Sequence, residues 1–362
     1  MKPTAADLAA REFASSSHRL ELEPLGKGLI NDTFLVTEGT RRWVLQRINR
    51  QVFNDPGAVM ANLRRLTDHA ERARRGSTGE PMRLPAVIPT RSGADLHRDE
   101  SGECWRAISY IDNTRTLHAI GGSEQAREVG RTLGWFHALV STLDPETLHD
   151  TLPGFHVTPA YLQAFDAVRA DPQPTRSDAD GLREALDFVD SRRSEADALE
   201  QARSRGDLKN HVIHGDPKLD NMLFDAGTGR GVSLIDLDTV KPGLLHHDLG
   251  DCLRSCCNIG GEGARPAEAI FDLGIFRSIL QGYWAEAGPI LTANDRDYLF
   301  PAIWLLPFEL GLRFLTDHLA GDCYFKVQYP GQNLQRALVQ FGLARSIETQ
   351  AGAITEILES MG

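Results

Sequence analysis

The chain has 362 residues, of which 41% are hydrophobic and 25% charged, and its formal net charge is −11. A chain of this length has room for about two domains and a sizeable core. An acidic balance without a long basic tract argues against nucleic acid or an anionic membrane as the main partner. It does not exclude a nucleotide, which local cations and a metal ion can hold.

The cysteine pattern and the first residues indicate a cytoplasmic protein. The five cysteines are odd in number and include no C-x-x-C pair, so neither a disulfide framework nor a zinc site is predicted. Residues 1–13 contain no apolar segment of signal-peptide length. No stretch approaches the roughly 20 apolar residues of a membrane span. No protein partner is evident from the sequence.

The amino-terminal part reads as a helix followed by strands. Residues 4–15 have amphipathic helical spacing, and strands are predicted at residues 20–25, 29–37 and 42–48. The turn 26–28 has the pattern G-x-G, which either lets backbone N–H groups approach phosphates or forms a plain hairpin turn. Gly26, Gly28 and Asn31 are therefore the candidate nucleotide contacts of this region.

The third strand carries two polar residues whose orientation decides their role. Arg47 either reaches nucleotide phosphates or is an exposed strand arginine. Gln46 points to the opposite face because side chains alternate, and a shift of one residue would turn Gln46 toward the cleft instead. A helix follows at residues 56–75, with Asp55 as its cap. Asp68 is short and Glu71 lies late in this helix, so no acidic partner for Arg47 is assigned.

The rest of the chain is predicted to be mainly helical after one more strand pair. The strand pair covers residues 89–96 and 104–110, and residues 111–114 form a hinge. Helices are predicted at residues 123–141 (capped by Ser123), 161–169, 180–205, 247–257, 266–287, 294–320 and 333–358. We therefore expect an α+β, bilobal protein, with a small antiparallel-sheet lobe at residues 1–112 and a larger, mainly helical lobe at residues 113–362.

One stretch carries the chemistry, residues 214–239, which read HGDPKLDNMLFDAGTGRGVSLIDLDT. It places Asp216, Lys218 and Asn221 close together in the sequence. An apolar run at residues 232–235 then leads to Asp236. The pattern H-x-D-x-K-x-x-N followed by an apolar strand that ends in Asp is typical of phosphoryl transfer.

Each of these residue types has a distinct role in such a reaction. Asp216 accepts or orients the proton of an attacking hydroxyl, and Lys218 neutralises charge on the transferred phosphoryl group. Asn221 and Asp236 supply the hard oxygen ligands that Mg²⁺ prefers. Asp238 is either a second metal ligand or a cap.

A later helix face offers a candidate acceptor site. Glu309, Arg313 and Asp317 are spaced four apart, so they share one face of the predicted helix. The two interpretations are a structural ladder of ion pairs and a face that closes the acceptor pocket.

The segments HGDPKLDN (214–221) and LIDLDT (234–239) resemble the aminoglycoside phosphotransferase and choline kinase superfamily, which has the protein-kinase-like fold. A closer similarity, to the bacterial N-acetylhexosamine 1-kinase group, is carried by GKGLINDTFLV (26–36), WVLQRINRQVFNDP (43–56), WRAISYIDNTRT (105–116), LIDLDTVKPGLLHHDLGD (234–251) and LRFLTDHLAGDCYFK (312–326). This similarity implies transfer of phosphate from ATP, with Mg²⁺, to the anomeric hydroxyl of N-acetylglucosamine or N-acetylgalactosamine.

The resemblance also implies residue roles. Asp216 would be the base and Asp236 a metal ligand, while Asp32 and Arg313 would lie near the sugar. His214 and Asp317 are the further candidate substrate contacts. The sequence departs from the protein-kinase pattern in lacking a clear Glu in the small-lobe helix.

Two other functions stay open at this point. The acceptor is an amino alcohol or an aminoglycoside in the first, although the moderate acidity of the carboxy-terminal lobe weighs against a polycationic acceptor. In the second, the chain is a nucleotide-binding pseudokinase. The intact Asp216, Lys218, Asn221 and Asp236 argue against a pseudokinase, because a scaffold needs none of them.

Overall fold

An antiparallel sheet of six strands forms the first part of the protein. The computed structural model describes residues 3–16, 19–26, 30–74, 82–170, 181–261 and 263–361. The strand order is β1-β2-β3-β6-β4, and β5 also pairs with β6. The strands are β1 (Leu20–Pro24), β2 (Asp32–Glu38), β3 (Arg41–Ile48), β4 (Val87–Ile88), β5 (His97–Arg98) and β6 (Cys104–Ser109).

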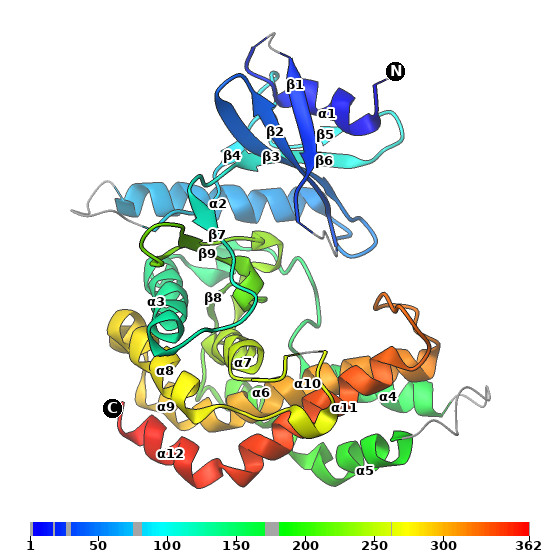
Figure 1. Cartoon of the computed structure of the whole chain (residues 1–362), viewed down its shortest axis with the longest axis vertical. Coiled ribbons are helices and arrows are strands. Elements are labelled where there is room, and N and C mark those ends of the chain that lie inside the picture. Colours follow the sequence, from blue (N-terminus) through cyan, green and yellow to red (C-terminus); the bar gives the residue numbers. More distant parts are fainter. Residues whose placement is uncertain are drawn as a thin grey trace.

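The two faces of this sheet pack against different partners. Trp43, Leu45, Trp105 and Ala107 point to one face, which we call the outer face, and form a small core with helix α1 (Ala5–Phe13). Alternate residues such as Ile48 point to the other face, the inner face, and join the main core of the protein. Figure 1 shows the inner face turned toward the helical part.

Helix α2 (Pro56–Arg74) lies between the sheet and the helical part (Figure 1). Asp55 caps it as predicted, because its Oδ1 accepts a hydrogen bond of 3.1 Å from the backbone N–H of Ala58. In its middle, buried Asn62 donates to the carbonyl oxygens of His149 and Val240 at 2.8 and 3.0 Å. The side chain of Asn62 therefore ties α2 to backbone carbonyls outside the six-stranded sheet.

Two small sheets frame the chemistry-bearing stretch. Strand β7 (Thr114–Arg115) begins at the last residue of the predicted hinge and pairs with β9 (Met222–Asp225), which pairs in turn with β10 (Gly231–Leu234). Strand β8 (His211–Ile213) pairs with β11 (Lys241–Gly243). The loops that follow β8 and β10 are thereby brought to one place.

Helices make up most of the remaining part. Their bounds are α3 (Ser123–Val140), α4 (Thr158–Arg169), α5 (Leu182–Arg192), α6 (Ala198–Arg205), α7 (Leu245–Cys256), α8 (Leu273–Ala287), α9 (Ala293–Asp297), α10 (Leu299–Ala320), α11 (Gln332–Thr349) and α12 (Ala351–Glu359). Helices α3 and α8 approach closely at Gly130 and Gly282. A Cβ at Gly130 would lie 1.8 Å from the carbonyl oxygen of Ile279, so only glycine fits there.

Helix α10 is the one helix of the described ranges that is long and apolar enough to cross a membrane, and 72% of that window is buried inside the protein. The expectation that no stretch approaches span length is therefore wrong for α10. Its apolar side chains, among them Phe308, Leu312 and Leu315, belong to the main core. The helix is apolar on most sides because it is surrounded by other helices.

Several predicted elements are shorter or interrupted. The predicted strand 89–96 is wrong, because a turn closes it with a 2.9 Å bond from the N–H of Gly93 to the carbonyl of Thr90. Ser123 does not cap α3, whose N-cap is Gly122. The predicted helix 180–205 is broken into α5 and α6 around a 3-10 turn at Arg193–Glu195, the predicted helix 294–320 into α9 and α10, and the predicted helix 333–358 into α11 and α12. In the predicted helix 266–287, α8 begins only at Leu273, after a 3-10 turn at Pro266–Glu268. The lobe boundary at residues 112 and 113 stays a prediction, and we use "small lobe" and "large lobe" in that sense.

Candidate active site

The loop after β8 gathers the predicted catalytic residues. The ammonium Nζ of Lys218 lies 2.6 Å from Oδ2 of Asp216. The amide Nδ2 of Asn221 donates to the same Oδ2 at 3.0 Å and to the carbonyl of Asp216 at 2.8 Å. Among the described residues, no hydrogen bond uses Oδ1 of Asp216. One carboxylate oxygen is thus fixed and the other is left to accept a hydroxyl proton.

The ion pair keeps Lys218 charged. Burial alone would lower the pKa of Lys218, but the facing carboxylate of Asp216 outweighs burial and raises that pKa well above its ordinary value. A permanent cation beside Asp216 can neutralise charge that develops on a transferred phosphoryl group.

Buried groups of the large lobe hold the backbone of this loop. Asp248 of α7 accepts hydrogen bonds from the backbone N–H groups of His214 and Gly215 at 2.6 and 2.8 Å. Its Oδ2 also lies 2.9 Å from Nε2 of His137. Burial would raise the pKa of Asp248, but the hydrogen bond and the positive potential of His137 hold it below its usual range. The loop therefore rests on a fixed carboxylate.

A second contact holds the same loop through His156, which lies just before α4. Its backbone is left-handed, with φ of 64°. Nε2 lies 2.8 Å from the carbonyl of Gly215, and Nδ1 lies 2.9 Å from Oε1 of Glu309 on α10. Both partners accept, so both ring nitrogens donate and the ring is an imidazolium. Burial would lower the pKa of His156, but Glu309 outweighs burial and raises it.

His214 has a positioning role, and the prediction that it contacts substrate is wrong. The residue is 0% exposed. Its Nε2 donates to the carbonyl of Ile235 at 3.0 Å, and its Nδ1 accepts the backbone N–H of Asp216 at 3.3 Å. Burial lowers the pKa of His214, in keeping with this neutral tautomer. The ring links Asp216 to the residue that precedes Asp236.

Asp236 follows β10 in a left-handed conformation, with φ of 64°. Its side chain reaches solvent, but loss of hydration to the surrounding protein and the neighbouring carboxylates of Asp238 and Asp216 together raise its pKa to about 7, against the lowering by Lys218 and Arg106. A bound cation would relieve the mutual repulsion of these carboxylates. The hydrogen bonds of Asn221 use its Nδ2, which leaves its amide oxygen free within the described ranges.

These donors fit Mg²⁺, which prefers carboxylate and amide oxygens with water and phosphate completing the shell. In the part of the chain that the structure describes, no three His, Cys, Asp or Glu side chains are arranged to hold a metal by themselves. Asn221, Asp236 and phosphate oxygens would therefore have to share it. A bound Mg²⁺ would supply positive charge against the nucleotide phosphates.

The inner face of the small sheet contributes a set of polar contacts above Asp236. The guanidinium of Arg106 on β6 lies 2.5 Å from Oδ1 of Asp238, and both side chains are 2% exposed. Asn31 donates to Oδ2 of Asp238 at 2.7 Å and accepts the backbone N–H of Asn49 at 2.9 Å. Of the predicted nucleotide contacts, Asn31 is thus brought to the site, where it holds Asp238.

Arg47 and Asp32 lie on the outer face, so the predictions that they meet phosphate and sugar are wrong. Arg47 has the same side-chain orientation as Trp43 and Leu45, which pack against α1. It is ion-paired with Asp32, directly opposite on β2, and both side chains are nearly half exposed. The alternative orientation that turns Gln46 toward the cleft is the observed one.

The predicted acceptor face of α10 divides into separate contacts and forms no ladder. Glu309 pairs with His156. Asp317 is buried and accepts the backbone N–H groups of Tyr324 and Phe325 at 2.8 and 2.9 Å, so it holds the loop after α10. The prediction that Asp317 contacts substrate is therefore wrong.

Arg313 keeps a position suited to an acceptor. Its guanidinium carbon lies 5.2, 5.1 and 5.6 Å from the ring centres of Phe155, Tyr161 and Phe325. Phe155 is the neighbour of His156, which holds the catalytic loop. Stacking on aromatic rings keeps the cation in place beside that loop.

The glycine turn of the small lobe is described only in part. Gly26 has φ of 71° and open space where a Cβ would lie. Gly28 lies outside the described residues, and the role of both glycines in binding a nucleotide stays a prediction.

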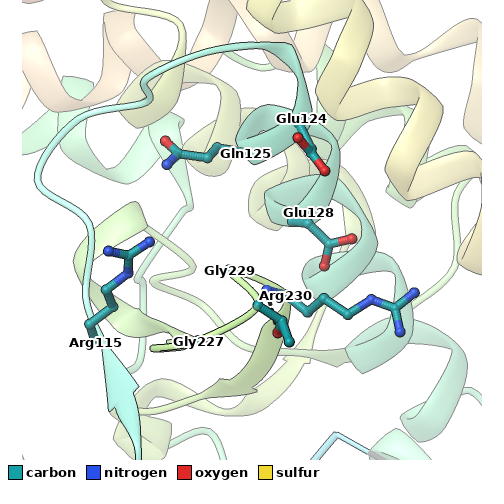
Figure 2. Close-up of a pocket in the computed structure, with 8 residues that line it drawn as sticks. Arg115, Glu124, Gln125, Glu128, Gly227, Gly229 and Arg230 are labelled. Atoms are coloured by element: carbon teal, nitrogen blue, oxygen red, sulfur yellow. Dashed lines mark hydrogen bonds between the residues drawn. The ribbon is translucent and has the colours of Figure 1, made fainter.

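One surface pocket of the described residues lies away from this chemistry. Its lining residues are Arg115, Glu124, Gln125, Glu128, Gly227, Thr228, Gly229 and Arg230. Figure 2 shows that they come from β7, the start of α3 and the turn between β9 and β10. Glu128 accepts the backbone N–H of Gly231 at 2.8 Å. This contact anchors the hairpin that leads to Asp236, and we assign the pocket no catalytic role.

Comparisons with known proteins agree with this geometry. The profile described as "Phosphotransferase enzyme family" matches residues 21–286, so the chain belongs to the phosphotransferase enzyme family. An aminoglycoside phosphotransferase from Alicyclobacillus acidocaldarius has a similar structure, with 16% identity, a TM-score of 0.67 and coverage of 99% of this chain and 98% of that chain.

Two more structures carry the same fold. A microcompartment-associated aminopropanol kinase has 17% identity and a TM-score of 0.60, with coverage of 96% of this chain and 97% of that chain. Choline kinase from Cryptosporidium parvum has 13% identity and a TM-score of 0.59, with coverage of 93% and 91%. These matches confirm the α+β, bilobal, protein-kinase-like fold with a small antiparallel-sheet lobe and a larger helical lobe.

Sequence reasoning missed Arg106 and His156, and it gave Asp248 no role. A charged residue within the otherwise apolar strand CWRAIS was a signal for Arg106. His156 left no signal, because its partners Gly215 and Glu309 are distant in the sequence.

Proposed function

We propose that the chain transfers the γ-phosphate of ATP, with Mg²⁺, to the anomeric hydroxyl of an N-acetylhexosamine such as N-acetylglucosamine or N-acetylgalactosamine. The observation that carries the phosphotransfer is Asp216, with Oδ2 fixed by Lys218 and Asn221 and Oδ1 free. The acceptor assignment is supported by the resemblance of the segments around residues 26–36 and 312–326 and by the environment of Arg313.

The catalytic steps follow from the positions of these groups. The acceptor hydroxyl donates a hydrogen bond to Oδ1 of Asp216, and its oxygen forms a bond to the γ-phosphorus. The bond between that phosphorus and the leaving oxygen of ADP breaks, and Asp216 takes the proton late in the transfer. Lys218 neutralises charge on the phosphoryl oxygens, while Asn221 and Asp236 hold the metal.

Arg313 favours a neutral acceptor over a cationic one. A guanidinium held among Phe155, Tyr161 and Phe325 repels an ammonium group and donates hydrogen bonds to hydroxyl or amide oxygens. The neighbouring aminopropanol kinase, choline kinase and aminoglycoside phosphotransferase support the second candidate, a cationic amino alcohol or aminoglycoside acceptor. The charge of the acceptor therefore separates the two candidates.

A coupled assay of ADP release tests the proposal. The purified chain is offered free sugars, N-acetylated amino sugars, choline, aminopropanol and aminoglycosides, each with Mg²⁺ and ATP. We expect turnover with an N-acetylhexosamine, and phosphorus NMR of the product should show an anomeric phosphate. Turnover with a cationic acceptor only would replace the first candidate by the second. Nucleotide binding without turnover of any acceptor would support a pseudokinase.

The variant Arg313→Gln sharpens this test because the two candidate acceptors predict opposite changes in the acceptor KM. For a neutral sugar, loss of a hydrogen-bonding cation should raise the acceptor KM by about 10-fold and leave nucleotide affinity unchanged. For a cationic acceptor, loss of the repelling charge should lower that KM. An unchanged KM would remove Arg313 from the acceptor site.

A further inference from the structure

The small lobe lacks a cation at the expected strand position. Phosphoryl-transfer enzymes of this fold class use a strand-borne cation against the nucleotide phosphates. On β3 the residue that points to the inner face is Gln46, and Arg47 points to the outer face. The residue paired directly with Gln46 on the neighbouring strand is Arg106. Directly paired residues share one face of a sheet, so Arg106 presents its cation beside Gln46.

Gln46 fixes the orientation of this cation. Its Oε1 accepts hydrogen bonds from Nε and Nη2 of Arg106 at 2.9 and 2.7 Å. Gln46 in turn donates from Nε2 to the hydroxyl of Thr33 at 3.1 Å. One edge of the planar guanidinium, formed by Nε and Nη2, is thus engaged, which leaves Nη1 as the group directed at Asp238 of the large lobe.

The remaining contact of Arg106 is a charge contact without a directed hydrogen bond. Nη1 lies 2.5 Å from Oδ1 of Asp238. Both atoms are buried, and neither has a hydrogen bond of acceptable geometry with any described residue. A buried donor and acceptor in this condition carry a free-energy cost, because each has lost water without gaining a full partner. A phosphate oxygen would give Nη1 the directed acceptor that it lacks.

We propose that Arg106 is the nucleotide-phosphate-binding cation of this enzyme, oriented by Gln46, and that Asp238 is its partner only until a nucleotide binds. This inference rests on the proposed function. Asp238 precedes the turn to β11 and lies two residues after the metal-ligand candidate Asp236. When Nη1 bonds to phosphate, Oδ1 of Asp238 loses this contact.

The first helix after β3 fits this rearranged pattern. A cation on β3 would need an acidic residue from α2, but the most deeply buried polar residue of α2 is Asn62, which donates to backbone carbonyls. In this chain the cation is Arg106 on β6, and Gln46 on the neighbouring strand β3 orients it. A neutral amide can do this because Asp238 already supplies the balancing charge in the free enzyme.

The test compares binding of ATP and adenosine to the full chain without acceptor, in the presence of Mg²⁺, by isothermal titration calorimetry. For Arg106→Met we expect ATP affinity to fall by about 10- to 100-fold, as for the loss of a charge-assisted hydrogen bond, with adenosine affinity unchanged. Arg47→Met, the matched loss of a strand arginine on the outer face, should change neither. A role of Arg106 limited to holding the lobes together would weaken ATP and adenosine alike.

A second variant keeps the test valid if Arg106→Met does not fold, which a thermal melt would reveal. Gln46→Met removes the orienting oxygen but keeps the ion pair, and it should cause a smaller loss confined to ATP. Unchanged ATP affinity in Gln46→Met and in a folded Arg106→Met, or a loss in Arg47→Met instead, would overturn the inference. A wild-type chain that binds no ATP would overturn the proposed function itself.

Discussion

The two halves of the site are built in different ways. In the large lobe, Asp216, Lys218 and Asn221 lie on one short loop, and buried groups from α7, α10 and the segment before α4 hold its backbone. In the small lobe, the groups that face the same region come from separate strands, with Arg106 on β6 and Gln46 on β3. One half is local in sequence and rigidly held, and the other is assembled by strand pairing.

This difference explains which half a sequence can reveal. On a loop, the spacing of residues directly limits how far apart their side chains lie. On a strand, a shift of one residue moves a side chain to the opposite face, so Arg47 and Gln46 exchange roles with no change in composition. The predictions below test the rigid half first and the strand-built half last.

The largest expected effect comes from Asp216→Asn. The amide cannot accept the hydroxyl proton, so kcat should fall by about 10²- to 10⁴-fold while ATP still binds. Steady-state kinetics with calorimetric measurement of ATP binding checks this. Asp220→Asn is the matched control, because its side chain is 64% exposed and it lies on the same loop. Equal activity of the two variants would exclude Asp216 as the base.

The next effect concerns the support beneath the loop. Glu309→Gln leaves the buried imidazolium of His156 without its carboxylate, so the free energy of unfolding should fall by about 3–5 kcal/mol. Because His156 holds the carbonyl of Gly215, kcat should fall as well, with little change in nucleotide affinity. Urea unfolding and kinetics measure both.

The control for Glu309→Gln is Glu184→Gln. Glu184 forms an exposed ion pair with Arg345, and loss of such a pair changes the unfolding free energy by about 0–1 kcal/mol. If both variants lose the same small amount, the catalytic loop is not held more firmly than the surface.

The same pair predicts a pH dependence of stability. The pKa of His156 is raised above 6.5, so its contribution is complete below 6.5 and is lost as pH rises through the raised value. The pKa of Glu309 is lowered below 4.5, so its contribution is complete above 4.5 and is lost as pH falls through the lowered value. Both contributions are therefore complete from pH 4.5 to 6.5.

Comparison of wild type with the double variant His156→Gln and Glu309→Gln measures this dependence. The difference in unfolding free energy between wild type and the double variant should be constant from pH 4.5 to 6.5 and should decrease at higher pH. Asp251 and His247 also face His156. Both remain in the double variant, so to first order their own titration cancels in the difference. A gap that grows with rising pH would contradict the imidazolium assignment.

The predicted elements that the structure confirms are those whose signals come from residues close together in the sequence. Helix α2 was predicted with its cap Asp55 because capping and amphipathic spacing involve neighbouring residues. The break of the predicted helix 294–320 into α9 and α10 at Tyr298 was missed. His156 was missed because its role depends on Gly215 and Glu309, which only the folded chain brings near it.

The smallest expected effect distinguishes the two faces of the small sheet at adjacent residues. Asp32 is nearly half exposed and pairs with Arg47 on the outer face. Asp32→Asn should therefore change the unfolding free energy by about 0–1 kcal/mol and leave the acceptor KM unchanged. The neighbouring Asn31→Ala should weaken ATP binding instead, because Asn31 is buried and holds Asp238. Kinetics of both variants at low and high salt checks this, since an exposed ion pair is screened by salt. A raised acceptor KM in Asp32→Asn would place the outer face at the sugar, contrary to the observed orientation of β2 and β3.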